Sequence, residues 1–236
     1  MSTGRSGDDH LREWAGLHGT EAPTGFVGGW LRAAAVVARP LARVGISPDA
    51  VTVAALVTAM AAVPLAAVAG WPGPAAACVA VTASGLLDSL DGAVAVQAGR
   101  ATRVGFLLDS ALDRLADAAF PAALAVVAAT RTAAWLAVGA TAAAWWLEYV
   151  RARSLLAEVG PPRPAGTRQL VTPGERPTRI VLTAVGLGLP FLAVAALWGQ
   201  VVIVGGSALF LLAHSLRRLA AADRDPGRRG PPTPTA

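Results

Sequence analysis

The chain alternates long apolar blocks with short segments rich in Pro, Gly and Arg, and this pattern sets the first expectation for its fold. Residues 50–70, for example, contain no charged side chain. A helix of that length crosses the roughly 30 Å hydrocarbon layer of a bilayer. Blocks of this kind recur along the chain. They predict an all-helical integral membrane protein with six membrane-spanning helices, at about 50–70, 75–96, 105–130, 132–153, 177–198 and 201–217.

The segments around these blocks predict the remaining organisation. Residues 1–24 are polar and predict a flexible leader, and residues 222–236, rich in Pro, Arg and Gly, predict a disordered tail. Residues 25–44 predict an amphipathic helix in the membrane interface, broken near Pro40, because three arginines fall on one helical arc. A solvated surface helix is the alternative. The three arginines on this arc are Arg32, Arg39 and Arg43. Residues 45–221 are then expected to form one transmembrane domain, which starts at the Ser47-Pro48-Asp49 turn and cap.

The composition supports the same class. Of 236 residues 54% are hydrophobic, and the mean hydropathy of +0.53 is too high for an ordinary soluble domain. The single cysteine, Cys78, excludes a disulfide framework or a thiolate metal cluster. The three histidines are scattered, so no histidine metal site is expected. The polar first residues lack the apolar core of a cleavable signal peptide, and no nucleic-acid partner is expected.

The arginines predict the orientation in the membrane. All 20 basic residues are arginines, and in the six-helix arrangement all but two lie on the side of the amino terminus. Arg131 falls on the opposite side and Arg114 within a span. The positive-inside rule therefore places both termini in the cytoplasm. The expected location is the cell (inner) membrane.

Aspartates interrupt the second and third apolar blocks. Asp88 and Asp91 are three residues apart, and Asp109, Asp113 and Asp117 follow at intervals of four. These spacings put side chains on one face of a helix, and a short turn joins the two helices. Charges inside a bilayer cost at least a few kcal/mol and usually face a partner in the bundle interior. We therefore expect the carboxylates to converge on one or two hard divalent cations, Mg²⁺ or Mn²⁺.

The stretch from Asp88 to Asp113 closely resembles the signature of the CDP-alcohol phosphotransferases. That signature reads D-x-x-D-G-x-x-A-R, eight residues, then G-x-x-x-D-x-x-x-D. Seven of its eight fixed positions match at the right spacing. The exception is Val96, where the family has an arginine. Arg100 or Arg103, in the turn that follows, is the candidate replacement for that charge, and a divergent subgroup is the alternative.

The resemblance implies roles for the matching residues. Three aspartates bind one or two metal ions that hold the diphosphate of a CDP-linked lipid, and Asp113 completes the metal site and acts as the general base. The three are Asp88, Asp91 and Asp109. Three small residues let CDP approach the backbone, and Asp88 contributes to CDP binding. Alternatively, the small residues serve close helix packing. These are Gly92, Ala95 and Gly105. Asp117, outside the signature, either supports the site or pairs with Arg114.

Two arginine-containing segments suggest the acceptor side. Tyr149–Arg153 and Glu175–Arg179 are similar to segments of the actinobacterial phosphatidylinositol phosphate synthases. The resemblance implies an acceptor that carries phosphate, inositol phosphate or glycerol phosphate, bound by four arginines. These are Arg151, Arg153, Arg176 and Arg179. The alternative is the positive-inside pattern together with contacts to anionic lipid, and Glu175 and Pro177 also fit plain helix capping.

The expected function is a transferase of phospholipid biosynthesis. It moves a phosphatidyl-type group from CDP-diacylglycerol to an alcohol and releases CMP, and by the family resemblance it works as a homodimer within membrane lipid. Three alternatives stay open. They are a catalytically impaired relative that still binds the CDP-lipid, a transporter that uses intramembrane carboxylates, and a membrane scaffold.

Overall fold

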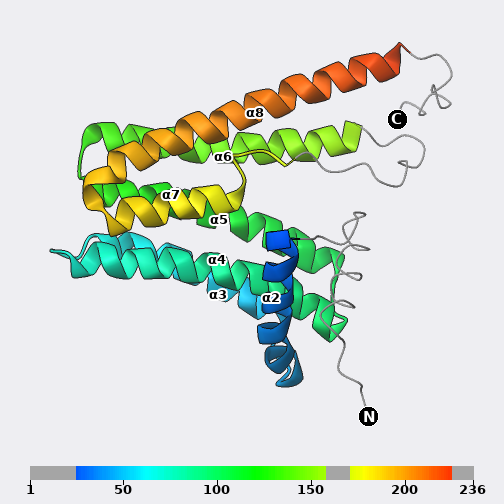
Figure 1. Ribbon diagram of the computed structural model, residues 1–236, viewed down its shortest axis with the longest axis horizontal. Helices are drawn as coiled ribbons and strands as arrows, with labels where there is room; N and C mark the ends of the chain where they lie inside the picture. The colour runs from blue at the N-terminus through cyan, green and yellow to red at the C-terminus, as the bar shows by residue number, and fades with distance from the viewer. Residues whose placement is uncertain (1–24, 158–170, 225–236) are drawn as a thin grey trace.

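The computed structural model describes residues 25–157 and 171–224, and these residues form a bundle of long helices (Figure 1). The predicted leader, part of the segment between the spans expected at 132–153 and 177–198, and nearly all of the predicted tail lie outside the described residues. Within the described ranges the chain contains no strand, as expected. The elements are α2 (Gly25–Arg43), α3 (Pro48–Ala66), α4 (Pro72–Ala98), α5 (Arg103–Ala128), α6 (Arg131–Ala157), α7 (Arg176–Gly188), the short 3-10 turn η1 (Pro190–Leu192) and α8 (Ala193–Asp223).

The bundle is held together by small side chains that let helices approach closely, with a few large residues filling the centre. Phe120 and Leu124 of α5 are fully buried in the main cluster, between alanines of α3 and α4 and Leu197 of α8. A second cluster joins α6 and α8 through Leu147 and Val204. Small residues at contacts are the usual means by which membrane helices pack.

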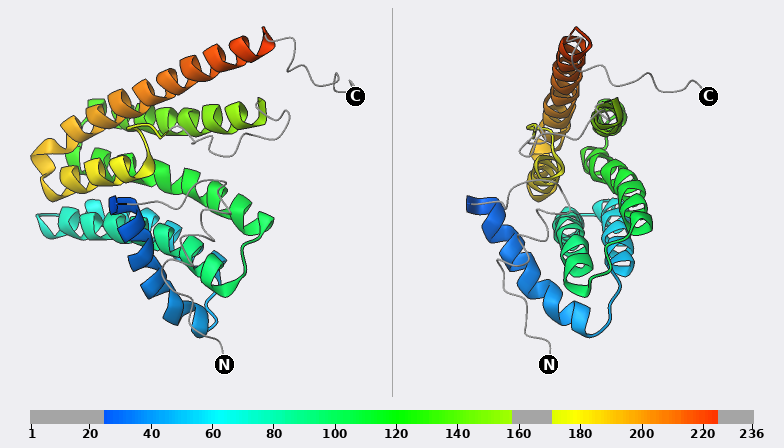
Figure 2. Two further views of the ribbon diagram at one scale, coloured as in Figure 1. Left: turned by 45° about the vertical axis from the view of Figure 1, so that its right-hand side comes forward. Right: turned by 90° about the vertical axis from the view of Figure 1, so that its right-hand side faces the viewer.

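Helix α2 crosses the bundle instead of running along it (Figures 1 and 2). Its buried Ala34 and Ala38 pack against Ala93 and Val94 of α4. The helix continues through Pro40 to Arg43, so the predicted break is wrong. A proline in a helix forfeits one backbone hydrogen bond, and here the helical pattern resumes at once, because Val44 N donates to Pro40 O at 3.0 Å. The side chains before residue 34, including Arg32, are not described.

The connection between α4 and α5 is short and well capped, which sets the two aspartate-bearing helix ends side by side. Gly99 ends α4 in the left-handed conformation, with φ +62°, where glycine carries no steric penalty. Thr102 then caps α5, since its Oγ1 accepts from Gly105 N at 3.0 Å. Ser47 caps α3 in the same way, as its Oγ accepts from Ala50 N at 3.2 Å.

The predicted turn between the last two helices was misplaced. The apolar pattern predicts spans at 177–198 and 201–217, but α7 ends at Gly188 and α8 runs from Ala193 to Asp223. Pro190 is the cause, because the residue before a proline is pushed out of helical geometry. Leu189 indeed has φ −127° and ψ 81°. Helix α8 also continues to Asp223, two residues into the predicted tail.

Among the described residues, three segments are long and apolar enough to cross a membrane: α3, α4 and Pro190–Asp223. Helices α5 and α6 are as long as α4 but carry more charged residues. Helix α7 has 13 residues and spans only about 20 Å at the usual rise per residue. Over residues 25–157 and 171–224 the protein is thus all-helical, with three segments suited by length and composition to cross a membrane.

Candidate active site

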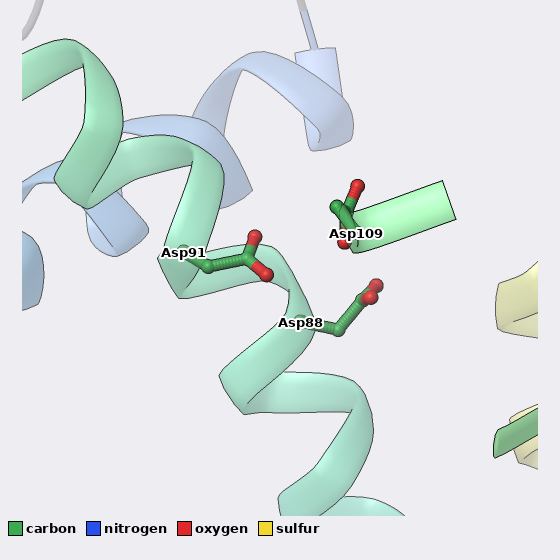
Figure 3. Close-up of side chains that lie close together, drawn as sticks. All are labelled: Asp88, Asp91 and Asp109. Carbon is green, nitrogen blue, oxygen red and sulfur yellow. The ribbon is translucent and has the colours of Figure 1, made fainter. Parts of the chain in front are cut away.

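Three carboxylates meet where the end of α4 faces the start of α5. Asp88, Asp91 and Asp109 each offer an oxygen, and these oxygens all lie within 4.8 Å of one another (Figure 3). The convergence predicted from the spacing of three on α4 and the short turn to α5 is confirmed for these residues. Like charges this close favour either protonation of one carboxyl group or a cation beside them, and oxygen ligands suit Mg²⁺ or Mn²⁺.

The three carboxylates differ in how they are held. The carboxylate of Asp91 accepts from Thr52 Oγ1 at 2.7 Å and from its neighbour Gly92 N at 2.5 Å. Asp109 Oδ1, in contrast, is buried without a hydrogen-bond partner. A buried carboxylate oxygen without a donor is costly unless a cation binds it. The donor set and this oxygen fit a divalent ion.

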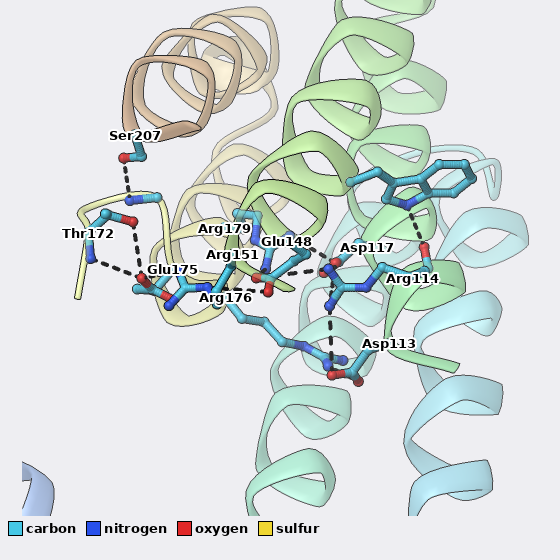
Figure 4. A network of polar contacts seen from close by, with 12 residues as sticks. Asp113, Arg114, Asp117, Glu148, Arg151, Thr172, Glu175, Arg176, Arg179 and Ser207 are labelled. Carbon is cyan, nitrogen blue, oxygen red and sulfur yellow. Dashed lines mark hydrogen bonds and ion pairs between the residues drawn. The ribbon is translucent and has the colours of Figure 1, made fainter. Parts of the chain in front are cut away.

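Arg176, the first residue of α7, lies against this cluster. Its Nη1 is 2.7 Å from Asp88 Oδ1 and also pairs with Asp113 Oδ1 (Figure 4). Asp113 lies one helical turn from Asp109 but outside the three-residue group. Its carboxylate faces Arg176. Together the four signature aspartates and Arg176 carry a formal charge of −3, which leaves room for divalent cations.

Asp117 lies deeper, in a buried ion-pair network. Its Oδ2 is 2.8 Å from Arg179 Nη1 and 3.3 Å from Arg114 Nη2, and Asp117 and Arg179 are each 2% exposed. Of the two roles weighed for Asp117, the structure shows the salt bridge to Arg114, with Arg179 as a second partner. Glu148 of α6 lies 3.8 Å from both of these arginines.

The remaining predicted acceptor arginines separate into two groups. Arg151 pairs with Glu175 at 2.6 Å and with Glu148 at 3.4 Å, so it belongs to the same network. Arg153 is exposed and lies over the Tyr149 ring, 5.8 Å from its centroid. The structure thus brings Arg151, Arg176 and Arg179 toward the centre and leaves Arg153 apart.

The small residues of the signature also differ from one another. A side chain at Gly92 would meet no other atom within 4 Å, so helix packing does not explain this glycine. At Gly105 a Cβ would lie 3.2 Å from Asp49 Oδ1, a close approach. Ala95 is half-buried. Val96 is 3% exposed, so the position of the family's arginine is closed to solvent here, whereas Arg100 and Arg103 are exposed.

Sequence reasoning missed two residues of the site. Thr52, one turn into α3, holds Asp91, but a threonine in an apolar block gives no distinct signal. Glu148 had a readable signal. It is an acidic residue in an apolar helix, three residues before Arg151, and such residues usually have partners in the bundle interior.

The family model for CDP-alcohol phosphatidyltransferases matches residues 45–216, which include α3 to α7, most of α8 and the whole aspartate cluster. The chain therefore belongs to the CDP-alcohol phosphatidyltransferase family. It is a transferase that moves a phosphatidyl-type group from a CDP-linked lipid to an alcohol.

Individual relatives agree with this assignment. The phosphatidylinositol phosphate synthase of Mycolicibacterium smegmatis is 32% identical over 204 residues, 83% of this chain and 86% of that protein. An archaetidylinositol phosphate synthase of Aeropyrum pernix is 40% identical over 95 residues, 39% of this chain and 46% of that protein. The crystal structure of the Mycobacterium tuberculosis phosphatidylinositol phosphate synthase with CDP-DAG bound is 25% identical, with a TM-score of 0.60 over 86% of this chain and 99% of that one.

Proposed function

We propose that the protein transfers the phosphatidyl group of CDP-diacylglycerol to an acceptor that carries a phosphate, with release of CMP. The observation that carries this proposal is the meeting of three carboxylates from α4 and α5 with Arg176 directly beside them. The M. tuberculosis relative, whose structure contains CDP-DAG, supports the choice of donor.

Asp88, Asp91 and Asp109 are the proposed ligands of one or two Mg²⁺ or Mn²⁺ ions. When bound, such ions neutralise the diphosphate and stabilise the departing CMP. Support comes from the 4.8 Å spacing and from the unpartnered Asp109 Oδ1. Asp113 lies outside this group, so its main proposed role is that of the general base. Binding of the metal by Asp113 is proposed as a second role.

Asp113 is the proposed acceptor of the proton from the attacking hydroxyl. It sits one turn from the metal ligand Asp109, and its contact with Arg176 fixes the orientation of the carboxylate. A general base must lie within hydrogen-bond reach of the hydroxyl that it activates. An acceptor whose phosphate binds Arg176 would present its hydroxyl close to Asp113.

The nucleotide is proposed to approach the backbone at three small residues, with Asp88 contributing. Gly92 supports this most directly, because the space beside its Cα is open. The others are Ala95 and Gly105.

Arg176 is the proposed ligand of the acceptor phosphate, because among the four predicted arginines it is the one in contact with the aspartate cluster. Arg151 and Arg179 are paired with acidic residues and are proposed to support it. All three relatives described above are named as inositol phosphate lipid synthases, which favours inositol phosphate over glycerol phosphate.

The proposed setting is the inner membrane, with six crossings, α2 in the cytoplasmic interface, both termini and the site cytoplasmic, and a homodimer as the assembly. The arginine distribution supports the orientation. The crossing direction of α2 supports its interfacial position (Figure 2).

An acceptor screen tests the proposal. Purified protein is incubated with labelled CDP-diacylglycerol, Mg²⁺ and either inositol phosphate, glycerol phosphate or free inositol, and CMP release is measured. We expect release with inositol phosphate and little with free inositol. Donor binding without release for any acceptor would instead favour an impaired relative, the second candidate, which the buried Val96 at the family's arginine position motivates.

A further inference from the structure

The five residues before Arg176 are attached to α8 by a buried hydrogen bond. Gly174 N donates to Ser207 Oγ at 2.9 Å (Figure 4). Ser207 is 5% exposed. A Cβ on Gly174 would lie 2.9 Å from Ser207 Oγ and from Val204 Cα, so the backbone here rests directly on α8.

A second anchor joins the same segment to α6. Glu175 Oε1 accepts from Thr172 N at 2.9 Å, from Thr172 Oγ1 at 3.0 Å and from Arg151 Nη2 at 2.6 Å. Glu175 occupies the N-cap position of α7, yet its side chain makes no capping bond. Its carboxylate therefore holds the turn that leads into α7 and does not cap the helix.

Both anchors act on the backbone immediately before Arg176, the side chain that reaches Asp88 and Asp113. We infer that Ser207, far along α8, is a positioning residue of the acceptor site: with Thr172, Glu175 and Arg151 it fixes where α7 begins and so where Arg176 presents its guanidinium. This inference rests on the proposed role of Arg176 toward the acceptor phosphate.

The physical reason is the length of the arginine side chain. A guanidinium on a flexible stem is placed accurately only when its backbone is fixed, and misplacement of a binding group by about 1 Å can cost up to about a hundredfold in rate. The side-chain hydrogen bond that Ser207 makes within the described residues goes to Gly174 and not to an aspartate, so its effect on the reaction has to pass through the start of α7.

The test compares Ser207→Ala with Ser215→Ala. Both serines lie on α8 and are equally buried, at 5% and 6% exposure, but Ser215 is two helical turns further along. We expect Ser207→Ala to raise KM for inositol phosphate about tenfold, while kcat and KM for CDP-diacylglycerol stay within about twofold. Ser215→Ala is expected to match wild type.

Thr172→Val provides a second, independent variant, since it removes the hydroxyl that donates to Glu175 and keeps the side-chain volume. The same selective rise in acceptor KM is expected. In parallel, hydrogen exchange should quicken at the amides of Thr172, Gly174, Glu175 and Arg176 in Ser207→Ala and not in Ser215→Ala, a readout that does not need activity.

Three results would overturn the inference. They are unchanged exchange at 172–176 in Ser207→Ala, quicker exchange with no change in acceptor KM, and an equal loss for donor and acceptor with a lowered melting temperature. A wild-type protein that releases no CMP contradicts the proposed function itself, which separates the two failures.

Discussion

At the scale of single residues, Arg176 joins the two parts of the site. Its guanidinium contacts Asp88, one of the three clustered carboxylates, and Asp113, the proposed base. One terminal nitrogen, Nη1, makes both contacts, since each terminal nitrogen of a guanidinium carries two N–H donors. On the proposed roles, the acceptor phosphate and the base would thereby be brought to one place.

Asp113→Asn is expected to abolish transfer and to leave donor binding intact. The amide keeps the shape and a carbonyl oxygen for Arg176 but does not accept the hydroxyl proton, so kcat should fall at least about a hundredfold. Turnover is measured by CMP release, and donor affinity by binding of labelled CDP-diacylglycerol. Asp223→Asn, at the exposed end of α8, is the matched control. Near-normal turnover in Asp113→Asn would refute the assigned base.

Contacts between site residues were predictable from the sequence where the partners lie close together in the chain. The periodicity of three and four, with a short turn between helices, predicted that Asp88 and Asp91 meet Asp109. The partner of Asp113 was not predictable in this way, because Arg176 lies 63 residues away and the pairing depends on how α7 packs against α5. The same holds for Thr52, whose role follows from the packing of α3 against α4.

At the scale of elements, α7 is the helix whose placement decides the site. It is short, it ends at Gly188 just before Pro190, and it brings Arg176 and Arg179, one turn apart, to two different aspartates of α5. The hydrophobic pattern alone predicted one helix across α7 and the first part of α8, because the apolar run is continuous across the turn. The signal that marks the boundary is Pro190, a local steric effect.

The Arg179–Asp117 pair should be a main link between α5 and α7. Arg179→Met leaves a carboxylate buried with Arg114 as its remaining partner, and we expect a loss of about 3 kcal/mol. Thermal unfolding in detergent measures the loss. The double variant Arg179→Met/Asp117→Leu should regain most of it, because no charge is then left unpaired.

Arg103→Met, at an exposed position on α5, is the control and should change stability by no more than about 0.5 kcal/mol. Equal melting temperatures for Arg179→Met and Arg103→Met would show that the buried pair does not hold the helices together.

At the scale of the whole molecule, the sequence predicted the class of fold and the family, and left the membrane crossings to be tested. Composition and apolar blocks were sufficient for an all-helical membrane protein, and the signature for the family. The number of crossings was harder to predict, because α5 and α6 carry the charges of the site and its network, which weakens their apolar signal.

Cysteine labelling in a Cys78→Ala background tests the predicted orientation. Single cysteines at Ala101, between α4 and α5, and at Ala222, near the end of α8, should react with an impermeant reagent from the cytoplasmic side. Ala69→Cys, between α3 and α4, should react from the opposite side. All three positions are exposed. Labelling of all three from one side would contradict the six-crossing arrangement.

The binding of Mn²⁺ to the purified protein, followed by electron paramagnetic resonance, tests the central claim most directly. The account predicts that the wild type binds the ion and that Asp109→Asn weakens binding at least about tenfold, since loss of an outer-shell partner alone typically costs that much. Asp223→Asn should bind as the wild type does. An Asp109→Asn protein with wild-type affinity for Mn²⁺ would contradict the claim that the carboxylates of α4 and α5 hold a divalent cation.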